Sequence, residues 1–141
     1  MEKDLAPPPR PLKTEAVPPG LHLLLDFWGG RYARDINAME KALRAAAAAC
    51  GATVLDIILH SFGPDAGVTG VAVLAESHIS IHTWPETDYI ALDVFTCGTC
   101  DAHKAADELI RHFQPVKYEI GAHKRGERKE QKKKVGVKGS C

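Results

Sequence analysis

The sequence predicts an α+β fold, in which an antiparallel sheet with both helices on one face forms a two-layer α/β sandwich. At 141 residues the chain is long enough for one compact domain. Its apolar positions follow the order strand, helix, four strands, helix, strand. Short turns separate the middle strands and the helices flank them, so neighbouring strands are expected to run antiparallel. Hydrophobic residues make up 45% of the chain and charged residues 26%, which is typical of a globular protein.

The first half of the pattern begins with an apolar strand. This strand is expected over Leu21–Trp28, where a Gly-Gly pair ends it. Asp35 is the predicted N-cap of a helix that runs to about Cys50, because apolar residues recur there at helical spacing. Gly51 follows as the expected stop signal.

The second half consists of shorter elements. Four apolar runs are predicted strands, namely Val54–Phe62, Val68–Ala75, His78–Thr83 and Tyr89–Thr96. Asp101 caps a second predicted helix, which Pro115 ends, and a last strand is expected over Val116–Ile120. A sheet covered by helices on one side leaves its other face open, and two such faces or edges often meet in a dimer.

Both ends of the chain are predicted to lie outside the domain, which is expected over residues 21–122. Residues 1–20 contain six of the nine prolines and are predicted to form an extended arm. Residues 123–141 form a basic tail. Because no aromatic residues are interleaved with its Lys and Arg residues, we expect a solvated extension and no nucleic-acid partner.

The cellular setting is predicted from what the sequence lacks. No apolar run approaches the roughly 18 residues of a membrane span. Acidic and proline residues interrupt the first ten positions, unlike in a secretory signal. We therefore expect a cytoplasmic protein whose cysteines stay reduced and that has no membrane partner.

The densest group of reactive side chains lies between residues 76 and 97. It comprises Glu76-Ser77-His78-Ile79-Ser80-Ile81-His82-Thr83-Trp84-Pro85-Glu86, followed by Phe95-Thr96-Cys97-Gly98. Alternation along the strand directs the two isoleucines to the core and His78, Ser80 and His82 to the opposite face. Solvation alone would explain polar residues there, but an indole beside a proline and a carboxylate indicates a pocket wall.

Three other kinds of site share some of these residue types. Zinc could bind Cys97, Cys100 and His103 together with strand histidines, but the usual second ligand pair is missing, so no metal is expected. A Cys-x-x-Cys redox centre typically lies where a strand of a parallel sheet leads into a helix. The antiparallel sheet expected here does not provide that setting, so this alternative has little support. A Ser-His-acid hydrolase needs a Gly-x-Ser-x-Gly turn, which is absent around Ser77. A serine directly after a carboxylate suits attack by Ser77 on its own backbone.

These motifs resemble those of the short prokaryotic S-adenosylmethionine decarboxylase proenzymes, which generate their own pyruvoyl cofactor. The resemblance extends from about Leu21 to Ile120 and includes Phe62-Gly63-Pro64 and Gly67-Val68-Thr69-Gly70. It implies that the Ser77 hydroxyl attacks the carbonyl of Glu76 and that the chain is cleaved between these residues. It also implies that Ser77 becomes the pyruvoyl group, which forms a Schiff base with the substrate amine.

The resemblance further implies which side chains assist these reactions. His82 would support processing by removing the Ser77 α-proton, with Thr69 where the family commonly has a serine. Cys97 would return a proton to the substrate carbon after loss of CO2. Simple alternation places Ser77 and His82 on opposite faces of one strand. A bend or bulge at Ser77 is therefore expected to bring them together.

The implied substrate is S-adenosylmethionine, whose decarboxylation supplies the aminopropyl donor for spermidine synthesis. Phe62 and Trp84 would pack against its adenine or sulfonium, and Glu86 would bind its ribose or cation. Phe62 matches the family's aromatic residue when one residue in 64–67 is treated as an insertion. Arginine or ornithine are the alternative substrates on the same fold, and an unprocessed, non-catalytic partner subunit is the non-enzymatic alternative. We expect the processed protein to be a homodimer.

Overall fold

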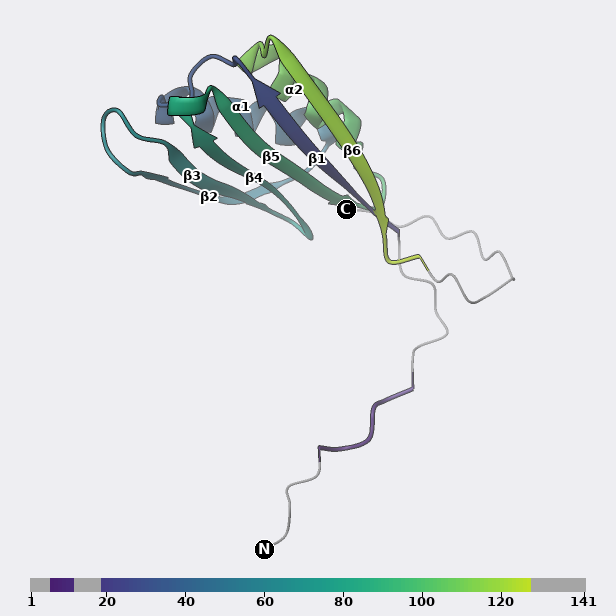
Figure 1. Cartoon of the computed structure of the whole chain (residues 1–141). Helices are drawn as coiled ribbons and strands as arrows, with labels where there is room; N and C mark the ends of the chain where they lie inside the picture. Colours follow the sequence, from purple (N-terminus) through teal and green to yellow (C-terminus); the bar gives the residue numbers. More distant parts are fainter. Residues whose placement is uncertain (1–5, 12–18, 128–141) are drawn as a thin grey trace, which may run out of the picture.

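The fold is a six-stranded antiparallel sheet with two helices (Figure 1), as seen in a computed structural model that describes residues 6–11 and 19–127. The strand order across the sheet is β2-β3-β4-β5-β1-β6, and every neighbouring pair is antiparallel. The strands are β1 Gly20–Trp28, β2 Val54–Ser61, β3 Val68–Leu74, β4 Ser77–Trp84, β5 Tyr89–Cys97 and β6 Lys117–Arg125. The helices are α1 Ile36–Cys50, α2 Ala102–Phe113 and a short 3-10 turn, η1 Pro85–Thr87.

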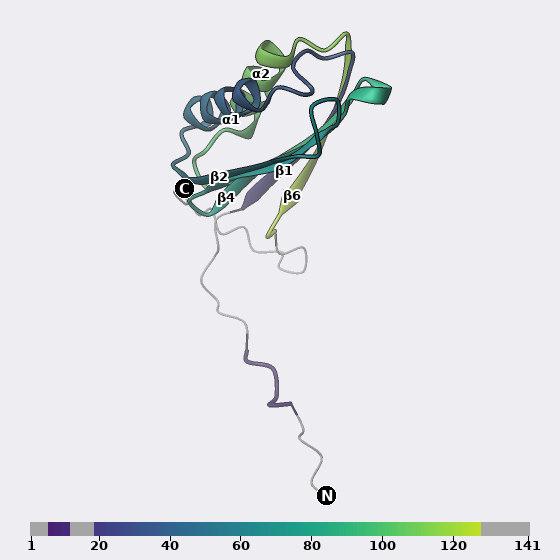
Figure 2. The same ribbon diagram turned by 90° about the vertical axis from the view of Figure 1, so that its left-hand side faces the viewer.

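Both long helices cover the same face of the sheet (Figure 2), which confirms the predicted two-layer sandwich. The core lies between the two layers, where Leu23, Met39, Ile79 and Phe113 are completely buried. Small side chains of α1 such as Ala46 are also fully buried, so this helix packs closely on its neighbours. None of the helices in the described part of the chain is long and apolar enough to cross a membrane.

The two helices begin and end where the sequence predicts. The side chain of Asp35 accepts a hydrogen bond from the Ala38 amide at the start of α1, and that of Asp101 accepts one from the His103 amide at the start of α2. Gly51 ends α1 with a φ of 84°, a left-handed conformation that glycine adopts without steric cost. The N-caps satisfy backbone donors that a helix start leaves unpaired.

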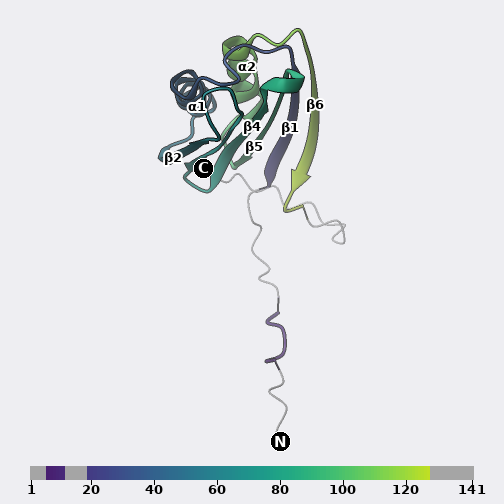
Figure 3. The same cartoon turned by 60° about the vertical axis from the view of Figure 1, so that its left-hand side comes forward.

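The last strand differs from its predicted extent. A strand was expected over Val116–Ile120, but β6 runs over Lys117–Arg125 and pairs with β1 along its whole length. It forms an edge of the sheet (Figure 3). Its residues are exposed and mostly polar, so the hydrophobic pattern ends before the backbone pairing does. Residues 123–125 of the predicted basic tail belong to β6, so the domain extends past its predicted end at residue 122. Most of the remaining tail and of the predicted N-terminal arm lies outside the described ranges.

The face of the sheet opposite the helices is called the open face here. Along β4 the side chains of Ile79 and Ile81 are buried under the helices, whereas His78, Ser80 and His82 are half-buried on the open face, as the alternation predicts. The open face therefore combines titratable groups with exposed apolar side chains such as Leu24.

Candidate functional site

The predicted cleavage site lies in the tight turn that joins β3 to β4. Leu74 and Ser77 are paired across the two strands, so the turn consists of Ala75 and Glu76. Glu76 has a φ of 57°, in the left-handed region that non-glycine residues rarely occupy. Such a conformation costs on the order of 1–3 kcal/mol. The peptide bond between Glu76 and Ser77 therefore follows a residue whose backbone is strained.

Cys97 lies directly beside this turn, at the end of β5. Its Sγ is 3.9 Å from the Ser77 hydroxyl, which donates to it, and 3.5 Å from Oε2 of Glu76. The Ser77 side chain is buried on the helix side of the sheet. We call Glu76, Ser77 and Cys97 the cleavage group. The antiparallel pairing of β4 with β5 brings these residues together although Cys97 follows about 20 positions later in the chain.

A second group of predicted site residues lines one cavity of about 540 Å³ at the other end of β4. Its walls include Phe62, Thr69, His82, Trp84 and Glu86, which we call the cavity group. The sequence analysis named all five of these residues. The structure thus gathers the predicted site residues into two groups.

The backbone around this cavity is tightly packed. Gly67 lies so close to β4 that a Cβ at this position would be 2.0 Å from the carbonyl oxygen of Thr83, so a larger residue would push the strands apart. The hydroxyl of Thr83 accepts from the Val68 amide at 2.9 Å and donates to the Ala33 carbonyl at 2.6 Å. These contacts hold the start of β3 against the end of β4.

Neighbouring side chains orient His82 and Trp84. Nδ1 of His82 is 3.2 Å from the hydroxyl of Thr69, its partner on β3, which leaves Nε2 as the other nitrogen for proton transfer. The indole of Trp84 stacks on Tyr89 with ring centroids 5.2 Å apart. The Tyr89 hydroxyl donates to Asp26, and this hydrogen bond, with burial, raises the pKa of Tyr89 to about 12. Tyr89 therefore stays neutral at physiological pH.

The two groups are too far apart to act on each other within one chain. Ser77 and His82 are five residues apart on a regular strand, which corresponds to about 16 Å at the usual rise per residue. The pairing of β3 with β4 continues from Leu74 and Ser77 to Thr69 and His82 without a shift in register. The expected bend or bulge that brings His82 to Ser77 is therefore wrong. The turn at residues 75–76 lies before β4, and the regular alternation along β4 leaves the side chains of Ser77 and His82 on opposite faces of the sheet.

The sequence analysis did not single out a polar cluster in the middle of the open face. Nε2 of His78 is 2.9 Å from Oδ2 of Asp93, His22 contacts the same oxygen, and Ser80 donates to Oδ1. Burial alone would raise the pKa of Asp93, but the hydrogen bonds from Ser80, His78 and His22 together lower it. The only sequence signals were polar residues at open-face positions of otherwise apolar strands.

In the described part of the chain, Cys97, Cys100 and His103 of the alternative zinc site do not form a metal-binding group with the histidines of β4. Cys100 lies in the loop after β5, where its amide donates to the Cys97 carbonyl at 3.3 Å. Within residues 6–11 and 19–127, the group of metal-binding side chains that meets in space is His22, His78 and Asp93. Neither cysteine belongs to that group.

Comparison with known proteins gives a consistent result. The sequence model of the S-adenosylmethionine decarboxylase family matches residues 21–126. A protein of Methanococcus maripaludis strain C7 named S-adenosylmethionine decarboxylase proenzyme is 48% identical over 110 residues, which cover 76% of this chain and 89% of the relative. A protein of the same name from Thermomicrobium roseum is 43% identical over 108 residues, covering 76% of this chain and 93% of the relative.

A solved structure supports the same assignment. The crystal structure of the adenosylmethionine decarboxylase from Aquifex aeolicus VF5 superposes with a TM-score of 0.68 and 34% sequence identity. The match covers 84% of this chain and all of the other. The region shared with these relatives contains every residue of the cleavage and cavity groups. The chain therefore belongs to the S-adenosylmethionine decarboxylase family.

Proposed function

We propose that this protein is a self-processing, pyruvoyl-dependent decarboxylase that converts S-adenosylmethionine to its decarboxylated form and CO2. The observation that carries the proposal is the cleavage group, in which a strained Glu76 precedes Ser77 and the Cys97 thiol lies 3.9 Å from the serine hydroxyl. Relatives that are 43–51% identical are named proenzymes, which agrees with a chain that must be processed.

Processing begins with Ser77. Its hydroxyl oxygen attacks the carbonyl carbon of Glu76, and the peptide C–N bond breaks as an ester forms. Removal of the Ser77 α-proton then expels the Glu76 carboxylate, which breaks the chain into residues 1–76 and 77–141. Addition of water and loss of ammonia leave a pyruvoyl group at position 77. Strain at Glu76 favours the first step, because the ester that replaces the Glu76–Ser77 peptide bond does not hold the turn in the strained conformation.

The residues around position 77 fit a pyruvoyl group at this position. A ketone at this position supplies the electron sink that decarboxylation of an amino acid requires. Cys97 lies beside it and carries a transferable proton, so we assign to its thiol the protonation of the substrate carbon after CO2 leaves. Ser77 is buried, which limits the access of bulk water to the reacting group at position 77.

A homodimer would complete the site. His82 is about 16 Å from Ser77 along β4, too far for proton transfer within one chain. His82 and Trp84 face away from the helices, and so does the exposed Leu24. If two open faces pack against each other in antiparallel fashion, the cavity group of one chain lies over the end of β4 that carries Ser77 in the other. The Ser77 side chain points toward the helices, so the partner's His82 would approach the backbone α-proton from the open face. His82 of the second copy would then remove the Ser77 α-proton.

The cavity group suits the proposed substrate. Phe62 and Trp84 present exposed aromatic surface inside the cavity. Aromatic faces stack on a planar base and attract a sulfonium cation. Glu86 adds a carboxylate that can accept hydrogen bonds from a ribose. The volume of the cavity, about 540 Å³, is within the usual range for a small-molecule site.

The test of the function is CO2 release by the purified full-length chain. S-adenosylmethionine, arginine and ornithine should be offered separately to the same preparation. We expect CO2 release from S-adenosylmethionine alone, because the cavity combines the aromatic side chains of Phe62 and Trp84, which suit a base and a sulfonium, with the Glu86 carboxylate. Release from arginine or ornithine with none from S-adenosylmethionine would refute the substrate and keep the pyruvoyl mechanism. No release from any of the three by a cleaved chain would refute the function.

Two inactive variants should restore cleavage when they share a dimer. The Ser77→Ala chain has no cleavable residue, and the His82→Ala chain lacks the proposed base. Each should stay whole when expressed alone. In a mixture of equal amounts, up to about half of the His82→Ala chains should be cleaved, because random pairing in a two-fold dimer supplies that share with an intact His82. Mass spectrometry of chains with different tags measures this fraction.

The control replaces the helper chain by the double variant Ser77→Ala/His82→Ala, which supplies no base to its partner. Cleavage in the first mixture but not in the second supports a shared site. A His82→Ala chain that stays whole in both mixtures contradicts the shared site, and one that is cleaved at the normal rate by itself contradicts the role of His82.

A further inference from the structure

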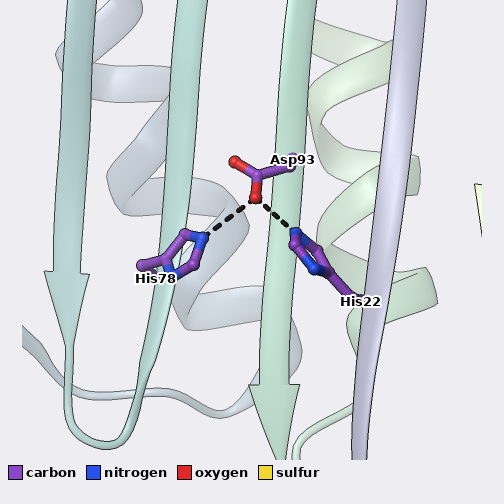
Figure 4. A group of neighbouring side chains, drawn as sticks. All are labelled: His22, His78 and Asp93. Atoms are coloured by element: carbon purple, nitrogen blue, oxygen red, sulfur yellow. Dashed lines mark hydrogen bonds and ion pairs between the residues drawn. The ribbon is translucent and has the colours of Figure 1, made fainter. Parts of the chain in front are cut away.

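Three side chains from neighbouring strands converge on one point of the open face. They are His22 on β1, His78 on β4 and Asp93 on β5, and their ligating atoms all lie within 4.8 Å of one another. Figure 4 shows both imidazoles directed at the same carboxylate from opposite sides. None of these residues belongs to the cleavage group or the cavity group.

We propose that His22, His78 and Asp93 bind a divalent transition-metal ion of the zinc class. Two imidazoles and one carboxylate are the ligand set of zinc sites that keep a fourth position open. All three ligands come from one chain, so the site depends neither on the proposed dimer nor on the proposed reaction. In the single chain the side chains of His22 and Asp93 are each 18% exposed and that of His78 is 39% exposed.

The sheet holds the three ligands in position. His22 and His78 both pair with Phe95, one on each side of β5, and Asp93 lies two residues before Phe95 on the same face. Ligands on paired strands keep their spacing better than ligands on loops. The hydroxyl of Ser80 donates to Oδ1 of Asp93, which orients the carboxylate and leaves Oδ2 for the ion.

Small movements suffice to accommodate an ion. Nε2 of His78 is now 2.9 Å from Oδ2 of Asp93. Bonds of about 2.0–2.2 Å in tetrahedral geometry place the donor atoms roughly 3.3 Å apart. The donor atoms now lie within 4.8 Å of one another, so each pair has to shift by about 1.5 Å or less. The ion would replace the protons that the two imidazoles share with the carboxylate.

Arg125 opposes metal binding and therefore provides a test. Its guanidinium Nη1 lies 3.2 Å from Nδ1 of His22. A guanidinium only donates, so Nδ1 accepts and Nε2 carries the imidazole proton in this arrangement. An ion at Nε2 moves that proton to Nδ1 and displaces the exposed Arg125 side chain. Removing Arg125 should then strengthen binding.

The experiment titrates the full-length chain, without a histidine tag and freed of metal by a chelator, with Zn²⁺. We expect one bound Zn²⁺ per chain by calorimetry and by metal analysis, with a tetrahedral Co²⁺ absorption spectrum as a second readout. Loss of a supporting hydrogen bond costs about 10–100-fold in metal affinity, so loss of a ligand in His22→Ala or Asp93→Asn should cost at least about 100-fold. Arg125→Gln should bind roughly three- to tenfold more tightly, because a nearby positive charge is removed.

Two variants serve as controls, and circular dichroism checks that every variant is folded. His60→Ala removes a histidine of β2 that is outside the cluster, and Cys100→Ser removes a potential ligand of the rival site. Both should bind Zn²⁺ like the unmodified chain. The proposal is overturned if the unmodified chain takes up no Zn²⁺. It is also overturned if folded Asp93→Asn binds normally, or if Cys100→Ser abolishes binding.

Discussion

Replacing Ser77 with alanine should leave the protein as one chain without detectable decarboxylase activity. The variant lacks the hydroxyl that attacks the Glu76 carbonyl, so neither the ester nor the pyruvoyl group can form. The unmodified protein should give two masses that correspond to residues 1–76 and 77–141, with no free amine at the start of the second piece. Intact-mass spectrometry measures cleavage, and CO2 release from S-adenosylmethionine measures activity.

Ser80→Ala is the matched control for this experiment. Ser80 lies three residues further along β4, but its hydroxyl is on the open face and donates to Asp93. Its loss should leave cleavage intact. A Ser77→Ala chain that is cleaved between residues 76 and 77, or an unmodified chain that is fully active while uncleaved, would exclude self-processing at Ser77.

Replacing Cys97 with alanine should separate turnover from processing. The thiol lies 3.5 Å from the Glu76 carboxylate and 3.9 Å from the Ser77 hydroxyl, close enough to protonate a substrate bound at position 77. A positioned acid typically contributes about 10²–10⁴-fold to a rate, so CO2 release should fall by that factor. Cleavage should continue, at least in part, because Ser77 is unchanged. Protonation at the wrong atom should also inactivate the variant over successive turnovers.

Cys100→Ala tests whether this effect is specific to Cys97. Cys100 is three residues away, and its backbone amide, which the substitution retains, bonds to the Cys97 carbonyl. Its loss should change the rate little. If Cys100 were essential and Cys97 dispensable, the assignment of the proton donor would be wrong and a redox or metal role for the Cys-x-x-Cys pair would gain support. Single-turnover CO2 release and mass spectrometry together distinguish these results.

The sequence by itself determined the elements of this fold. Asp35 and Gly51 bound α1 because capping depends on residues next to the helix ends. Alternation in β4 separated the buried Ile79 and Ile81 from the polar open face, because a strand has a fixed two-residue period. The motif around Ser77 and Cys97 indicated the family, which the comparisons confirm. These signals are local in the chain, so one sequence suffices to detect them.

Only the tertiary structure decided which of these elements meet. β1 pairs with β5, which brings His22 beside Asp93 across 71 positions of the chain, and β4 on the other side of β5 adds His78. The structure also shows that β4 has no bulge, so the regular rise of an extended strand keeps His82 about 16 Å from Ser77. Strand order and register depend on the packing of the whole core and on contacts between distant residues. A local pattern fixes the register of a hairpin such as β3–β4, but not the pairing of strands that lie far apart in the chain.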